Sequence, residues 1–252
     1  MRLHYEVHGD GPPLILLHGF LGSLDNWRSI SKRLADSYTV YSLDLRNHGA
    51  SPHSQAMNYP VMAEDLLEFF DEHDIATVQL LDHSMGGKVA VQFATDNPDR
   101  LSKLIVVDIA PRAYPPFQRP MLEALRKLDL QGVKSFGAID AALAPDVRDE
   151  MTRRFLLKNI ARDTNGFRWK IPLDAIIENY EELTKAVTMK AQFYKPACFI
   201  RGGQSEYIQD EDLTLIKSNF PGARIVTIET AGHWVHVDAP DEFLRTVRTF
   251  LD

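Results

Sequence analysis

Ser84 is the residue of this chain whose setting first points to chemistry. It lies in residues 83–87 (HSMGG), after the apolar run Val78–Leu81 and before the helix-forming run Lys88–Ala94. A serine at a strand-to-helix turn presents its hydroxyl above the carboxyl edge of a sheet, and small residues follow because the helix passes close to neighbouring backbone. Ser84 is therefore a candidate nucleophile. The alternative is a serine that only caps the helix, a role this residue often takes.

Other chemically capable residues stand where further strands are expected to end. In parallel sheets functional groups collect at the carboxyl ends of strands. These ends carry residues 18–20 (HGF), Asp44, Asp108, the loop 202–207 and residues 231–233 (AGH). A nucleophile, an acid and a histidine thus occur in the order Ser…Asp…His. Ester hydrolysis needs a base for the serine proton, an acid to orient that base, and N–H donors for the oxyanion.

His233 is the expected base, because Gly232 lets the loop turn tightly and present the imidazole over the sheet edge. We expect the nearby His236 to pack against the closing helix instead. Asp238, which directly precedes Ala239-Pro240, is expected to cap that helix rather than act as the catalytic acid.

The acid has two candidates. Asp108 ends the strand that follows the nucleophile strand, 24 residues after Ser84, and Glu206 lies one strand further on. The oxyanion donors would be the main-chain N–H groups of Phe20 and Met85, the latter at a helix N-terminus, where partial positive charge favours an anion. The polar loop 44–51 (DLRNHGAS) is interpreted as a hydrogen-bond cluster that shapes the site.

Composition narrows the class of protein. The chain has 252 residues, 44% of them hydrophobic, and a net charge of −7, which argues against a nucleic-acid partner. No apolar run reaches the roughly 20 residues of a membrane span, and the N-terminus lacks the apolar block of a signal peptide. The single cysteine, Cys198, favours a reducing compartment, so we expect a cytoplasmic protein. The chemistry above requires no metal and no cofactor.

Strand and helix patterns alternate along the first part of the chain, which predicts an α/β fold with a mostly parallel sheet between helices. The alternation stops between Arg112 and Lys190, where we expect only helices. We therefore divide the chain into an α/β core, residues 1–111 and 191–252, and an inserted helical cap, residues 112–190.

Three cap cations recur every four residues, at Arg154, Lys158 and Arg162, and are predicted to share one helix face. Such a face is commonly only solvated. The alternative is that it attracts an anionic leaving group, such as the phosphates of coenzyme A.

Taken together, residues 18–20 (HGF), 44–49 (DLRNHG), 83–87 (HSMGG) and 231–234 (AGHW) resemble the α/β-hydrolase superfamily over essentially the whole chain. Residues 107–111 (VDIAP) and 201–208 (RGGQSEYI) are most similar to the small bacterial esterases and thioesterases of the YbfF type. That resemblance implies that the aspartate after the strand following the nucleophile is the acid, which favours Asp108 over Glu206.

Two features depart from the superfamily pattern. The short N-terminus leaves no room for the extra first strand, so we expect about seven strands rather than eight. Asp82 stands where the elbow motif G-x-S-x-G has its first glycine. A carboxylate there could raise the pKa of nearby acids, and the sequence explains it no further.

The sequence therefore predicts a serine esterase, or an acyl-CoA thioesterase, that acts on a small-molecule ester or thioester through an acyl-enzyme. Alternatives on the same triad are C–C bond hydrolysis and cofactor-free perhydrolysis. A non-catalytic ligand-binding homologue is the alternative from another class. Haloalkane dehalogenase and epoxide hydrolase activities are disfavoured, because those resemblances need an aspartate at the position of Ser84.

Overall fold

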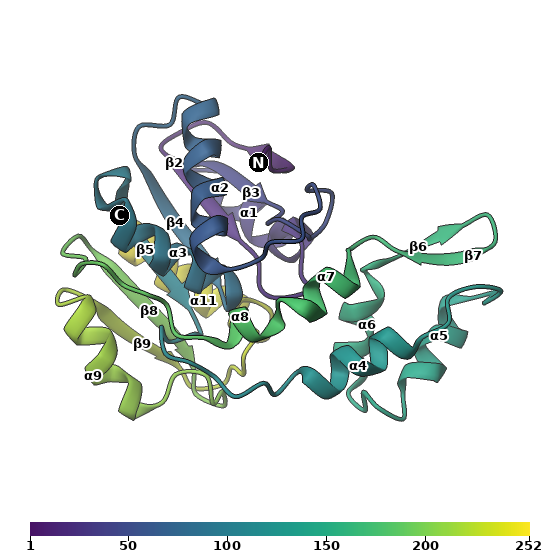
Figure 1. The fold of residues 1–252 in the computed structure, drawn as a ribbon. Coiled ribbons are helices and arrows are strands. Elements are labelled where there is room, and N and C mark those ends of the chain that lie inside the picture. Colours follow the sequence, from purple (N-terminus) through teal and green to yellow (C-terminus); the bar gives the residue numbers. More distant parts are fainter.

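A computed structural model describes all residues, 1–252, and is built around a seven-stranded sheet (Figure 1). The order across the sheet is β1-β3-β2-β4-β5-β8-β9, with β1 antiparallel to β3 and every other pair parallel. The predicted strand number and the mostly parallel sheet are confirmed. The strands are β1 (Tyr5–His8), β2 (Pro13–Leu17), β3 (Thr39–Leu43), β4 (Val78–His83), β5 (Leu101–Val107), β8 (Ala197–Gly202) and β9 (Arg224–Ile228).

Both faces of the sheet are buried, which is why its central strands have continuous apolar sequences. Alternate side chains of each strand enter two different cores: Ile15 and Leu17 enter one, and Leu14 and Leu16 enter the other. The helices that cover the first face are α2 (Tyr59–Glu72), α3 (Met85–Asp96) and α9 (Asp210–Asn219). Those on the second face are α1 (Arg28–Leu34), which follows the 3-10 turn η1 (Leu24–Trp27), and α11 (Pro240–Leu251).

Two short elements complete the α/β part of the chain. The 3-10 turn η2 (Pro98–Arg100) links α3 to β5, and α10 (Val235–Asp238) immediately precedes α11. None of the helices combines the length and the apolar character that crossing a bilayer requires.

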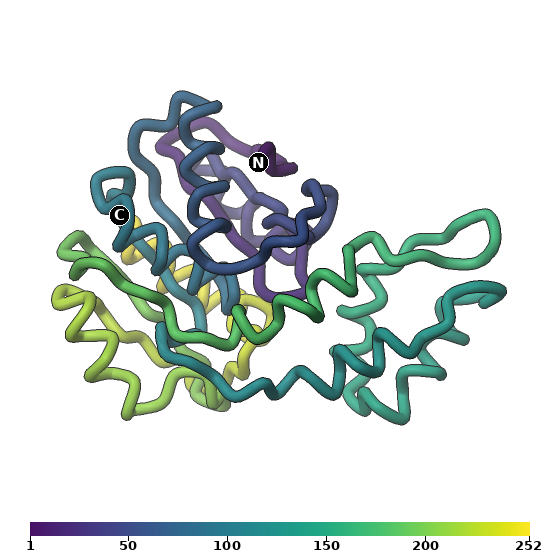
Figure 2. The backbone as a smooth tube through the Cα atoms, in the orientation of Figure 1, coloured from purple at the N-terminus to yellow at the C-terminus, as the bar shows by residue number.

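The segment between β5 and β8 extends to one side of the sheet (Figures 1 and 2). It contains α4 (Arg119–Lys127), α5 (Phe136–Leu143), α6 (Glu150–Leu157), α7 (Leu173–Glu178) and α8 (Tyr180–Thr184). We call residues 112–190 the cap. Apolar cap residues, such as Leu122, Ile139 and Phe167, join the same buried cluster as the core residues on the α3 face of the sheet.

The prediction that the cap contains only helices is wrong. Strands β6 (Ile160–Asp163) and β7 (Gly166–Trp169) form an antiparallel hairpin that is separate from the main sheet. The strands have only four residues each, too few to show a clear alternation. Thr164 and Asn165 connect the strands, and Gly166, the first residue of β7, has φ 138°; the pair Asn165-Gly166 is the signal that the sequence offered for a turn here.

The hairpin also overturns the predicted cationic helix face. Helix α6 ends at Leu157, so Arg154 lies on the helix, Lys158 caps its end, and Arg162 lies on β6. The three cations are spaced four residues apart, but the chain is no longer helical after Leu157. They therefore do not share one helix face.

Candidate active site

Ser84 lies at the sharp turn that the sequence predicts, between β4 and α3. Its backbone has φ 53° and ψ −117°, a strained conformation for a residue other than glycine. The following residues must be small: a Cβ on Gly86 would lie 2.7 Å from the carbonyl oxygen of His18, and one on Gly87 would lie 2.7 Å from Ile109. Close contact between α3 and the end of β2 therefore holds the turn in place.

The imidazole of His233 lies between Ser84 and Asp108. Its Nε2 is 3.1 Å from Ser84 Oγ, and its Nδ1 is 2.8 Å from Asp108 Oδ2. Because a carboxylate can only accept, Nδ1 carries the hydrogen and Nε2 is free to accept the hydrogen of the serine hydroxyl. This is the arrangement in which a histidine can act as general base for a serine.

Asp108 is fully buried and has a positive φ of 51°. Besides His233, the Gly202 N–H donates to its Oδ1 at 3.0 Å, and the Ser205 hydroxyl donates a short hydrogen bond to its Oδ2. The other acid candidate, Glu206, is exposed and makes no hydrogen bond to His233. The structure thus brings Asp108, and not Glu206, together with His233 and Ser84.

Three contacts hold the His233 loop. The ring of Tyr207 stacks on the imidazole with centroids 3.8 Å apart, the His233 carbonyl lies 2.9 Å from His83 Nε2, and Gly232 N–H donates to Asp238 Oδ2 at 2.9 Å. The expectation that Asp238 caps the closing helix is wrong. Asp238 ends α10, and Ala239 occupies the N-cap of α11 without a side-chain cap.

His236 packs as predicted against the closing helix. Its ring lies 4.4 Å from that of Trp27 and 6.0 Å from that of Phe243, which belongs to α11. Burial lowers the pKa of His236 to about 3, so this imidazole is neutral at pH 7.

The Phe20 loop lies against the nucleophile: a Cβ on Gly19 would be 3.3 Å from that of Ser84. The main-chain N–H of Phe20 has no hydrogen-bond partner within the protein. Met85 is the first residue of α3, where N–H groups have no acceptor within the helix. Both N–H groups are therefore available as oxyanion donors.

The loop 44–51 holds the Phe20 loop through hydrogen bonds between main-chain N–H groups and histidine rings, in keeping with the predicted hydrogen-bond cluster. The Leu45 N–H donates to His18 Nε2 at 3.0 Å, and the Leu21 N–H donates to His48 Nε2 at 3.1 Å. Asp44 accepts from the N–H groups of Leu24 and Ala50. Burial lowers the pKa of His18 and takes that of His48 to about 3, so both rings stay neutral and keep one accepting nitrogen.

Asp82 now has a structural role. Its side chain is fully buried, and Oδ1 accepts the N–H of Leu17 at 3.1 Å, next to the loop that carries Phe20. Its Oδ2 has no partner, and burial raises the pKa of this carboxyl well above its usual value. The sequence suggested an effect on neighbouring acids, whereas the shift falls on Asp82 itself.

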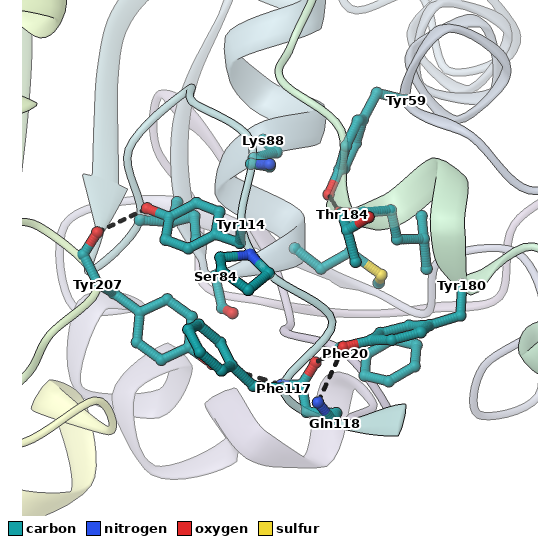
Figure 3. A pocket seen from close by; sticks show the side chains of 14 residues that line it. Phe20, Tyr59, Ser84, Lys88, Tyr114, Phe117, Gln118, Tyr180, Thr184 and Tyr207 are labelled. Carbon is teal, nitrogen blue, oxygen red and sulfur yellow. Dashed lines mark hydrogen bonds between the residues drawn. The ribbon is translucent and has the colours of Figure 1, made fainter. Parts of the chain in front are cut away.

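Ser84 opens onto two spaces. One is a narrow pocket of about 50 Å³ that is also lined by Phe20, Met85 and Lys88 (Figure 3). The other is a cleft of about 620 Å³ between core and cap, lined by His233, Trp234, Met151 and Phe155 among others. Gln118 and the aromatic rings around it separate the two, because Gln118 bonds to both Tyr180 and Tyr207.

Comparison with known proteins decides the family. The family model described as "alpha/beta hydrolase fold" matches residues 12–240. The chain belongs to the α/β-hydrolase family. It is 33% identical to the esterase YbfF of Escherichia coli (strain K12) over 95% of this chain and 93% of that one. It is 34% identical to the sn-1-specific diacylglycerol lipase of Xenopus tropicalis over 98% of this chain and 80% of the relative.

Among solved structures, a marine microorganism esterase superposes with a TM-score of 0.96 and is 41% identical, with 98% of each chain covered. These relatives make this α/β-hydrolase an enzyme of the esterase and lipase type. The predicted membership of the YbfF-like group is likewise confirmed. The roles of Ser84, His233, Asp108, Phe20 and Met85 stay predictions that the geometry supports.

The structure adds residues that sequence reading did not assign. Ser205 donates to Asp108, Tyr207 stacks on His233, and Asp238 holds the loop that carries His233. The only signal for the first two was their place in residues 201–208. Ser205 contacts Asp108, 97 positions earlier in the chain, and Tyr207 contacts His233, which follows another strand. Only the fold reveals these contacts.

The assignment of the acid predicts a difference between two conservative variants. Asp108→Asn removes the charge that supports the imidazolium and should lower kcat by about 10³- to 10⁴-fold. Glu206→Gln should leave kcat close to that of the wild type, because the exposed Glu206 does not reach His233. Steady-state kinetics on a p-nitrophenyl ester test both; a collapse of kcat in Glu206→Gln alone would show that the acid is misassigned.

The buried histidines predict how stability depends on pH. Burial lowers the pKa values of His18, His48, His83 and His236 below the unfolded value of about 6.5. Below that pH the unfolded chain binds more protons than the folded one, so the free energy of unfolding falls as pH decreases from 6.5. Each such histidine contributes a slope of up to about 1.4 kcal/mol per pH unit.

Guanidinium unfolding between pH 8 and pH 5 measures this slope. His236→Gln should reduce the slope by up to one bound proton, which is about 1.4 kcal/mol per pH unit. His53→Gln replaces an exposed histidine and serves as the matched control. The raised pKa of Asp82 makes the free energy of unfolding change with pH in the opposite direction. Asp82 is present in the wild type and in both variants, so its contribution cancels in the comparison. An unaltered slope in His236→Gln would contradict the burial argument.

Proposed function

We propose that this enzyme is a serine carboxylic-ester hydrolase that works through Ser84, His233 and Asp108. The observation that carries the proposal is the continuous hydrogen-bonded line from Asp108 through His233 to Ser84. The relatives named esterase and lipase support the same class of reaction.

The reaction proceeds in two acyl transfers. Ser84 Oγ attacks the ester carbonyl while His233 Nε2 takes its proton, and the N–H groups of Phe20 and Met85 hold the oxyanion. His233 then donates that proton to the departing alcohol, which leaves an ester on Ser84. A water molecule then attacks this ester while His233 takes its proton, and His233 returns that proton to Ser84 Oγ as the bond to the acyl carbon breaks, which releases the acid and restores Ser84.

The two spaces beside Ser84 receive different halves of the substrate. Met85 lines only the narrow pocket and Phe20 lines both spaces, whereas His233 lines only the wide cleft. His233 must protonate the leaving oxygen, so the alcohol lies in the cleft between core and cap. The acyl group then lies in the narrow pocket, whose volume of about 50 Å³ favours a short chain.

Replacing the nucleophile provides the direct test. Ser84→Ala should lower the turnover of p-nitrophenyl butyrate by at least about 10⁴-fold and abolish fluorophosphonate labelling. The far-ultraviolet circular dichroism spectrum should be retained. The matched control is Ser102→Ala, in which a serine at the other end of the sheet, on β5, is removed and labelling should persist. Undiminished turnover in Ser84→Ala would overturn the mechanism.

Acyl-CoA thioesters are a second substrate class, favoured by the cation at the mouth of the cleft. Lys158 lines the cleft and forms no ion pair, whereas the neighbouring Arg154 pairs with Glu150. An unpaired cation there can attract the phosphates of coenzyme A.

Salt dependence tests this second class. Raising NaCl should increase KM for butyryl-CoA, because screening weakens attraction between exposed charges, but not KM for neutral p-nitrophenyl butyrate. Lys158→Gln should reduce the salt dependence of the thioester. The same salt dependence for both substrates would count against a coenzyme A site.

We also propose a cytoplasmic location, from the single cysteine. Burial raises the pKa of the Cys198 thiol to about 12, which keeps it protonated and unreactive. A thiol of this kind is typical of a structural residue in a reducing compartment.

A further inference from the structure

Lys88 lies in the wall of the narrow pocket, on the same helix as Ser84. It follows the nucleophile by four residues, about one turn of α3 or roughly 6 Å of rise. Its side chain is only 1% exposed, and Lys88 lines the pocket together with Ser84 and Met85 (Figure 3). A buried lysine is normally paired with a carboxylate.

No carboxylate pairs with Lys88. The ammonium group has three hydrogens, and the protein accepts one of them, at the carbonyl oxygen of Lys185, 2.6 Å from Nζ. The rings of Tyr114 and Tyr59 lie with their centroids 4.9 and 5.2 Å from Nζ. Both phenol hydroxyls donate elsewhere, to the carbonyls of Tyr207 and Leu183, so neither ring brings a negative charge to Lys88.

The nearest other charge is also positive. The guanidinium of Arg112 lies 4.0 Å from the centroid of the Tyr114 ring, and its Nε donates to the buried carboxylate of Asp212 at 2.7 Å. Burial and the charge of Arg112 together lower the pKa of Lys88 to about 7. The lining of the narrow pocket contains no carboxylate, so the two remaining N–H donors of Lys88 have no acceptor in the protein and can serve an anionic ligand.

We propose that Lys88 binds a carboxylate at the far end of the acyl group, so that the preferred substrates are half-esters of short dicarboxylic acids. The proposal rests on the function proposed above, in which the acyl group enters the narrow pocket. Ser84 holds one end of the acyl chain and Lys88 the other. Because α3 fixes both residues, one length of diacid should fit better than its homologues.

A purely structural role makes a different prediction. If Lys88 only ties α3 to residue 185, its loss would lower stability and would affect neutral and anionic substrates alike. Lys103 is the matched control: its Nζ also donates to main-chain carbonyls, those of Phe250 and Leu251, and lies 6.0 Å from the Phe250 ring centroid. Lys103 lies on β5, away from both spaces beside Ser84.

The experiment compares kcat/KM for phenyl hydrogen glutarate with kcat/KM for phenyl valerate, which has the same acyl length without the charge. The wild type should prefer the anionic ester, and the succinate and adipate homologues should show a maximum at one length. Lys88→Met should lower the ratio of anionic to neutral ester at least tenfold, whereas Lys103→Met should keep the wild-type ratio.

The proposal is overturned if the wild type has a ratio of anionic to neutral kcat/KM below one, or if Lys88→Met and the wild type have the same ratio. In either case, turnover of phenyl valerate would leave the esterase assignment intact. If neither ester is hydrolysed and Ser84 is not labelled, the esterase assignment itself fails. Should Lys88→Met not fold, inhibition of the wild type decides: glutarate must inhibit phenyl valerate hydrolysis more strongly than valerate does, and equal inhibition overturns the proposal.

Discussion

The buried carboxylate of Asp108 is the group on which this edge of the sheet depends. An ion without solvent costs several kcal/mol unless hydrogen bonds compensate it. Its three donors come from the end of β8, from the loop that follows, and from the loop after β9. The hydrogen bonds to the Asp108 carboxylate therefore hold three chain segments next to one another, and they place the imidazole of His233 beside Ser84. A hydroxyl at Ser205 suits this design, since a second carboxylate there would repel Asp108.

On the opposite side of Ser84, burial disfavours the charged forms of the titratable groups. Asp82 accepts one hydrogen bond, from Leu17, and burial raises its pKa, whereas Asp108 accepts three. His18 and His48 are neutral rings that accept main-chain N–H groups and so position the Phe20 loop. The proposed oxyanion hole needs fixed donors and no competing anion nearby, and the raised pKa of Asp82 favours the second condition.

The elements that the sequence predicted well are those whose signal is local. Strands buried on both faces have continuous apolar runs, and the turn at Ser84 requires small residues at Gly86 and Gly87 because α3 passes close to β2. Ser84, His233 and Asp108 could be named because each follows a predicted strand. The position of Asp108 also needed a family resemblance to separate it from Glu206.

Local signals fail where a residue acts on a distant partner. Asp238 has the sequence context of a helix cap, yet its carboxylate bonds to Gly232 six residues earlier. Helical spacing placed Arg162 beside Lys158, but the chain turns into a hairpin between them. The burial that changes the state of Asp82 and Lys88 comes from several elements at once, so no short stretch of sequence contains it.

Core and cap both contribute to the recognition of a substrate, because cap residues line both spaces beside Ser84. The narrow pocket ends at Lys88 and Tyr59, on α3 and α2, and α3 cannot move without disturbing the turn at Ser84. The cap side of the wide cleft is formed mainly by α6, with Met121 of α4 beside it. Changes in α6 can therefore alter the wide cleft without moving Ser84. The narrow pocket is instead coupled in part to α3, the helix that begins directly after Ser84, and its shape is the more constrained of the two.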